Sequence, residues 1–110
     1  MIGQDGRCRE LESDGPLLGI GTRFGWDTRR ERFSPGDRLV LFSDGVTEAS
    51  GLEPGLFGLE RLKGVIVKSR DEAPEIAVER VVEKLRAYFA GQPAQDDITL
   101  VIVDRLLATK

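Results

Sequence analysis

The chain has 110 residues, of which 40% are hydrophobic and 32% charged, and its formal net charge is −3. This composition is typical of a globular chain with one modest core, and the length is too short for two domains. A slightly acidic chain without a block of Lys and Arg argues against nucleic acid as the main partner, because that binding depends on clustered basic residues.

The rarer residue types exclude several chemistries. Cys8 is the single cysteine, which rules out an internal disulfide, and histidine is absent. Without histidine the chain cannot hold a Ser/His/Asp triad, a Cys-His pair or a zinc site of the usual kind. Any metal would have to be held by oxygen atoms, which favours magnesium, manganese or calcium.

The sequence also bears on the compartment. Residues 1–15 are polar and lack the apolar segment of a signal peptide, and no stretch approaches the length of a membrane span. The single cysteine is compatible with a reducing environment. We therefore expect a cytoplasmic protein without membrane insertion.

The first third of the chain predicts only short elements. Arg7 to Leu11 alternates enough for a weak edge strand, and Leu17 to Ile20 is a short apolar run. Phe24 to Phe33 predicts one or two short strands, with Trp26 and Phe33 as core candidates. We interpret this region as scaffold.

The central stretch runs from Pro35 to Ala49. A turn signal precedes the apolar run Leu39 to Phe42, which predicts a buried strand, and Asp44-Gly45 follows it. Asp-Gly is also a favoured hairpin turn. Because the residues after Gly45 do not alternate like a returning strand, a strand that ends in a short helical turn fits better. A carboxylate at the end of a buried strand is held rigidly, as metal and catalytic carboxylates usually are.

Two amphipathic helices are predicted next. Phe57 begins a pattern of apolar residues at helical spacing that reaches Ile66, which predicts a helix packed on a sheet. A second helix is predicted from about Glu72 to Phe89, with Asp71 as its cap and Pro74 in its first turn.

Asp96-Asp97 leads into the second long apolar strand, Ile98 to Val103. If this strand pairs antiparallel with Leu39 to Phe42, Asp44 and Asp96 lie at the same edge of the sheet. Converging carboxylates repel each other unless a cation lies between them, so this arrangement indicates a metal. The alternatives are an ordinary polar turn before a strand for Asp96-Asp97, and for Glu48 a first-turn acid favoured by the helix dipole.

Three blocks of the chain together resemble a known family. Pro35 to Ala49, Phe57 to Leu62 and Asp96 to Leu100 resemble the last three blocks of the PPM-type, protein phosphatase 2C-like serine/threonine phosphatases, in their SpoIIE-like bacterial branch. The resemblance covers nearly the whole chain. It implies an α+β fold that is part of an α-β-β-α sandwich, with antiparallel sheets flanked by helices. Residues 1–110 would then be a single domain, the C-terminal half of such a phosphatase domain.

The resemblance also implies an activity in signal transduction. Such enzymes hydrolyse phosphoserine or phosphothreonine with a metal-activated water and form no covalent phosphoenzyme, and two or more Mg²⁺ or Mn²⁺ ions are expected in the complete domain. By position, Asp44 and Asp96 match catalytic, metal-binding aspartates, and Glu48 matches an acid linked to an additional, weaker metal site. Asp97 would support the site or the strand rather than bind metal. The implied substrate is a phosphorylated regulator such as an anti-sigma-factor antagonist.

One departure limits this expectation. The family's N-terminal half supplies an early Asp-Gly metal motif and a Gly-His-Gly-like segment, and residues 1–34 match neither. We therefore expect weak metal binding by this chain alone, and a face open to the missing N-terminal half or to a second copy. The alternative is a truncated or degenerate regulatory or binding module that does no chemistry. A calcium-binding EF-hand loop is set aside, because Gly55 stands where a bidentate Glu would be needed.

Overall fold

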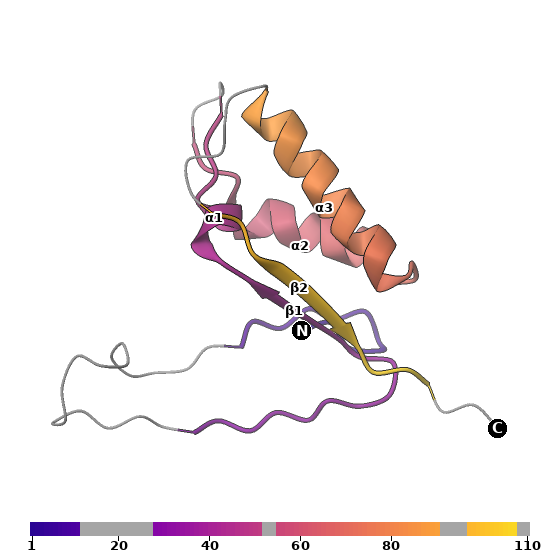
Figure 1. The fold of residues 1–110 in the computed structure, drawn as a ribbon. Helices are drawn as coiled ribbons and strands as arrows, with labels where there is room; N and C mark the ends of the chain where they lie inside the picture. The colour runs from indigo at the N-terminus through magenta and orange to yellow at the C-terminus, as the bar shows by residue number, and fades with distance from the viewer. Residues whose placement is uncertain (12–27, 52–54, 91–96, 108–110) are drawn as a thin grey trace, which may run out of the picture.

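The computed structural model describes residues 1–11, 28–51, 55–90 and 97–107 (Figure 1). These residues form a small antiparallel sheet and three helices, which confirms the expected α+β class. In chain order the elements are β1 (Arg38–Phe42), α1 (Asp44–Thr47), α2 (Gly58–Lys68), α3 (Pro74–Phe89) and β2 (Leu100–Asp104).

The sheet consists of the two long apolar runs. β1 and β2 pair antiparallel, with Arg38 opposite Asp104 at one end and Phe42 opposite Leu100 at the other. The antiparallel pairing on which the expected position of Asp44 beside Asp96 depends is therefore present, although β2 begins two residues later than Ile98. As Figure 1 shows, the end of β1 and the beginning of β2 lie side by side next to α1.

Both long helices are confirmed, with one difference at a boundary. α3 begins at Pro74 rather than Glu72, and its N-cap is Ala73, not Asp71. The reason is steric: a residue before proline is disfavoured in the helical region, and Ala73 has a ψ of 152°. Proline itself is well suited to the first helical position, where no N–H is needed.

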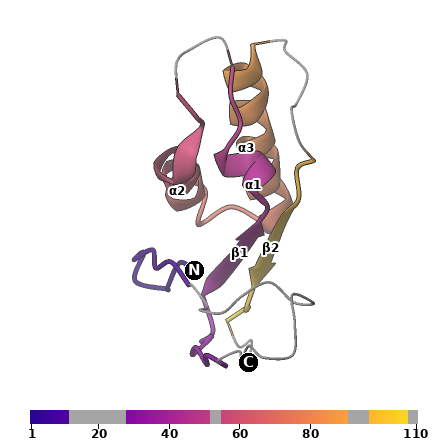
Figure 2. The ribbon, with the colours of Figure 1, turned by 90° about the vertical axis from the view of Figure 1, so that its left-hand side faces the viewer.

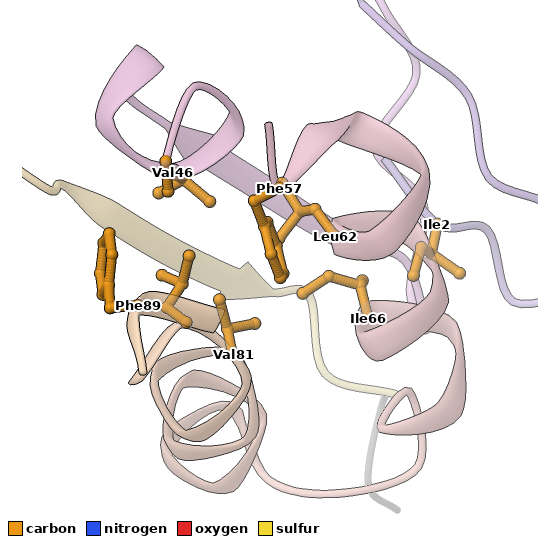
Figure 3. Packing of buried hydrophobic residues seen from close by; sticks show 9 residues of the cluster. Ile2, Val46, Phe57, Leu62, Ile66, Val81 and Phe89 are labelled. Carbon is orange, nitrogen blue, oxygen red and sulfur yellow. The ribbon is translucent and has the colours of Figure 1, made fainter. Parts of the chain in front are cut away.

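α2 and α3 lie on one side of the sheet and α1 lies at its end, as Figures 1 and 2 show. Val40, Leu100 and Ile102 of the sheet contact the buried cluster. Figure 3 shows its side chains converging between the strands and the helices. The cluster consists of Ile2, Val46, Ala49, Phe57, Leu62, Ile66, Val81, Leu85 and Phe89.

The opposite face of the sheet is apolar and largely uncovered in the part of the chain that the structure describes. Leu41 pairs with Val101 and Leu39 with Val103, on the side facing away from the helices. Leu41 is 51% exposed, Val101 43% and Val103 41%. We call Leu39, Leu41, Val101 and Val103 the outer sheet face.

The N-terminal segment departs from its prediction. Ile2 is buried and bridges both Cys8 and Arg38, but residues 9–11 form no strand. Residues 28–33 form none either, so that part of the strand prediction is wrong. Phe33 is only partly buried and is not in the core cluster, contrary to expectation. Trp26 and the run Leu17 to Ile20 lie outside the described residues.

The Arg38 side chain connects the sheet to the segment between α2 and α3 by hydrogen bonds. Its side chain is 4% exposed and donates hydrogen bonds to both carboxylate oxygens of Asp104, at 2.6 and 2.8 Å. It also donates to the backbone carbonyls of Ser69 at 3.0 Å and Glu72 at 2.6 Å, in the connection between α2 and α3. The hydrogen bond with Asp104 raises the pKa of Arg38 above its usual range, so the guanidinium remains charged.

Candidate metal centre at the end of the sheet

Asp44 lies where the sequence predicts it. It is the first residue of α1, directly after β1 and Ser43, and it is exposed. Ser43 has extended backbone angles (φ −90°, ψ 165°), so the chain passes from strand to helix within one residue. The strand followed by a helical turn is confirmed, and the alternative of a hairpin turn at Asp44-Gly45 is wrong.

Gly45 lets the two strands approach closely at this end. A Cβ at position 45 would lie 2.0 Å from the backbone oxygen of Asp97 and 2.9 Å from its carbonyl carbon. Such distances are far inside van der Waals contact, so a side chain here would force the two segments apart. The backbone of Asp97 therefore lies directly against the turn that carries Asp44.

Ser43 provides a polar connection between the same two segments. Its hydroxyl accepts a hydrogen bond from the backbone N–H of Thr99 at 2.9 Å and donates one to the backbone carbonyl of Asp97 at 3.3 Å. Its own backbone N–H donates to the carbonyl of Thr99 at 3.0 Å. Sequence reasoning missed Ser43, because a serine before a helix is normally read as a cap.

The remaining candidate residues occupy different positions. Asp97 is exposed and lies at the same end of the sheet as Asp44, whereas Asp96 lies outside the described residues. Glu48 is exposed and is the C-cap of α1, with its backbone N–H donating to the carbonyl of Asp44 at 2.8 Å. It is therefore not a first-turn acid, and the helix dipole does not account for an acid at that end.

The chemistry of these side chains fits a hard divalent cation. Asp44, Glu48 and Asp97 offer carboxylate oxygens, the ligands that Mg²⁺ and Mn²⁺ prefer. Across the described ranges, however, no group of three or more His, Cys, Asp or Glu side chains lies close enough together to hold an ion. The described residues therefore do not form a closed metal site.

Two hollows lie among the described residues. A groove of about 990 Å³ runs between α2 and α3 and is lined by residues such as Phe57, Arg61 and Tyr88. A smaller hollow of about 270 Å³ lies between the N-terminal segment, β1 and α2. Neither of these two hollows is lined by Asp44 or Asp97.

A strand that ends in an aspartate, held by glycine against a second acid-bearing segment, is the arrangement expected of PPM-type phosphatases. The family model described as stage II sporulation protein E (SpoIIE) matches residues 1–106. The chain belongs to the SpoIIE family of PPM-type phosphatases.

Two curated relatives are similar to nearly the whole chain. Protein IcfG of Synechocystis sp. is 27% identical over 105 residues, which are 96% of this chain and 16% of that protein. Phosphoserine phosphatase RsbU of Bacillus subtilis is 29% identical over 102 residues, which are 93% of this chain and 30% of that protein. The chain thus spans less than a third of the length of either relative. No solved structure matches it.

Proposed function

We propose that residues 1–110 form the C-terminal half of a metal-dependent phosphatase domain that hydrolyses phosphoserine or phosphothreonine on a bacterial regulatory protein. The observation that carries the proposal is the close approach of two acid-bearing segments, with the Asp97 backbone against Gly45 next to Asp44. Membership of the SpoIIE family supports the reaction class. The printed name of RsbU, a phosphoserine phosphatase, supports the substrate chemistry.

In this proposal Asp44 and Asp96 bind the ions and are the catalytic carboxylates. Glu48, one helical turn beyond Asp44, would bind an ion at an additional, weaker metal site. Asp97 would support the metal site or the start of the strand without binding an ion itself. Mg²⁺ or Mn²⁺, when bound, would lower the pKa of the attacking water and neutralise charge on the phosphate ester. The task of the chain itself is to hold Asp44 at the end of a hydrogen-bonded strand and to keep the two segments in contact.

The proposed partners follow from the same assignment. The substrate is a phosphorylated protein, such as an anti-sigma-factor antagonist, in a cytoplasmic signalling pathway. In the described part of the chain, no helix is long and apolar enough to span a membrane. The N-terminal half of the domain would cover the outer sheet face and supply the missing ligands, and a second copy of the chain is the other candidate for that face.

The test is phosphate release from a phosphoserine peptide in the presence of Mn²⁺, with this chain joined to the N-terminal half of a SpoIIE-family phosphatase domain. We expect activity that EDTA abolishes and that Asp44→Asn reduces by at least about 100-fold, the upper range for loss of a group that orders a metal site. Asp71→Asn is the matched control, because the Asp71 side chain is 93% exposed and lies outside the candidate centre. An inactive joined protein, or an active Asp44→Asn variant, would contradict the proposal.

The second candidate is a non-catalytic regulatory or binding module of the same fold. It is favoured by the lack of a three-ligand cluster among the residues that the structure covers. This candidate predicts specific binding to a partner protein that EDTA does not change. Binding that requires Mn²⁺ and the Asp44 carboxylate would contradict it.

A further inference from the structure

We propose that Ser43 is a positioning residue for the cation site. In this inference, which rests on the proposed function, its side chain clamps the segment Asp97 to Thr99 onto the turn that carries Asp44. The clamp sets the spacing between the two acid-bearing segments. Ser43 itself does not touch the ion or the substrate.

The first supporting observation is what the Ser43 hydroxyl does. A serine at the N-cap normally accepts a hydrogen bond from an N–H of its own helix. In α1 the Ser43 side chain makes no such bond. It accepts from the Thr99 N–H at 2.9 Å instead, and donates to the Asp97 carbonyl at 3.3 Å. The side chain is therefore used between the strands rather than within the helix.

The second observation is where the regular ladder stops. The paired register ends with Phe42 opposite Leu100, and α1 turns the chain away immediately after Ser43. Asp97 lies three residues before Leu100, the first paired residue of β2. The Ser43 hydroxyl donates to the carbonyl of Asp97. The hydrogen bonds between the two segments therefore extend from Thr99 back to Asp97.

The third observation is that the clamp acts at a tight contact. The Asp97 oxygen that accepts from Ser43 is the same atom that would lie 2.0 Å from a Cβ at position 45. The absence of a side chain at Gly45 lets the Asp97 carbonyl oxygen approach the turn, and the hydrogen bond from Ser43 stabilises this contact. Metal ligands must be kept within about 0.5 Å of their productive positions, and a hydroxyl that fixes this backbone oxygen holds the start of the β2 segment against the turn that carries Asp44.

A pair of variants of the same shape isolates the hydroxyl. Ser43→Thr keeps the hydroxyl, and Ser43→Val replaces it with a methyl group. Ser43→Ala removes it without adding bulk, and Ser34→Ala is a control that removes a serine hydroxyl before the other end of β1. We expect the Thr99 amide to exchange faster with solvent in the Val and Ala variants than in wild type and Ser43→Thr.

Cation binding is measured on the same ¹⁵N-labelled chains by titrating Mn²⁺ and following paramagnetic broadening of the Asp44 and Gly45 amide signals. We expect the Mn²⁺ concentration for half-maximal broadening to rise about 10-fold in Ser43→Val and Ser43→Ala, the usual effect of losing a residue that orients a ligand. Ser43→Thr and Ser34→Ala should behave like wild type. Thermal melts recorded on every variant show that each is folded.

The outcomes separate the two proposals. If Mn²⁺ broadens the wild-type signals and the Thr and Val variants respond at the same concentration, Ser43 has no positioning role and the cation site stands. An unchanged Thr99 exchange rate in folded Ser43→Val would likewise overturn the clamp. If Mn²⁺ leaves the wild-type Asp44 signal unchanged both in this chain and in the chain joined to the N-terminal half of a SpoIIE-family phosphatase domain, the proposed cation site fails, and the positioning role fails with it.

Discussion

Arg38 and Asp104 face each other across the two strands, joined by two hydrogen bonds of 2.6 and 2.8 Å. The Arg38 side chain is almost fully buried, and Asp104 is the carboxylate that accepts from it. Removing one partner of a buried pair leaves the other charge uncompensated.

We therefore predict that Asp104→Ala lowers the free energy of unfolding by about 3 kcal/mol. The measurement is urea denaturation followed by circular dichroism. The double variant Arg38→Met/Asp104→Leu should lose less than Asp104→Ala, because it removes both charges together. A double variant as unstable as the single one would show that packing around Arg38, rather than charge pairing, is what matters.

Gly45→Ala should destabilise the chain and weaken Mn²⁺ binding at the same time. Its Cβ would collide with the Asp97 backbone, and overpacking at such a contact costs about 1–3 kcal/mol. Gly64→Ala in α2 is the matched control, because a Cβ there meets nothing within 4 Å. That change should stabilise the helix by up to about 1 kcal/mol. Equal effects of the two substitutions in denaturation experiments would contradict the close approach at Gly45.

Divalent ions should stabilise the folded chain through Asp44. An ion that binds only the folded state at 100 times its dissociation constant adds about 2.7 kcal/mol. We expect Mn²⁺ to raise the melting temperature, and EDTA to reverse the rise. Asp44→Asn should abolish it, whereas Glu48→Gln should reduce it only slightly, because Glu48 is assigned to the weaker site. A larger loss with Glu48→Gln than with Asp44→Asn would reverse the proposed order of the two ligands.

The outer sheet face should control association. Val101→Lys places a charge on this face at a position that is already 43% exposed, so we expect the free energy of unfolding to change by less than about 0.5 kcal/mol. Binding to the N-terminal half of the domain, measured by calorimetry, should be lost. Val67→Lys, on the exposed side of α2, is the control and should bind normally. Analytical ultracentrifugation of the isolated chain tests the second copy: a dimer that Val101→Lys dissociates would favour that occupant.

The sequence predicted the elements that depend on local periodicity. β1, α2 and α3 follow from apolar runs and helical spacing, and Asp44 follows from its place after β1, whereas the antiparallel pairing entered only as a condition. The misses depend on contacts that periodicity does not encode. The bridge from Ile2 to Arg38 is long-range, and Ala73 displaced Asp71 as the cap because of the proline that follows it.

The candidate site was only partly predictable for a similar reason. The position of Asp44 could be predicted from the apolar run that precedes it. Ser43 could not, because a hydroxyl at an N-cap has the same sequence signature whether it serves its own helix or another strand. Only the geometry of Thr99 and Asp97 distinguishes the two uses.

The clamp between Ser43 and Asp97 joins positions 54 residues apart. No short peptide from this chain could reproduce it, since both α2 and α3 lie between the two residues in the sequence. The affinity for an ion at the candidate centre would then depend on the fold of all the residues between Ser43 and Asp97. A substitution in the core formed by α2 and α3 could abolish ion binding without changing any ligand.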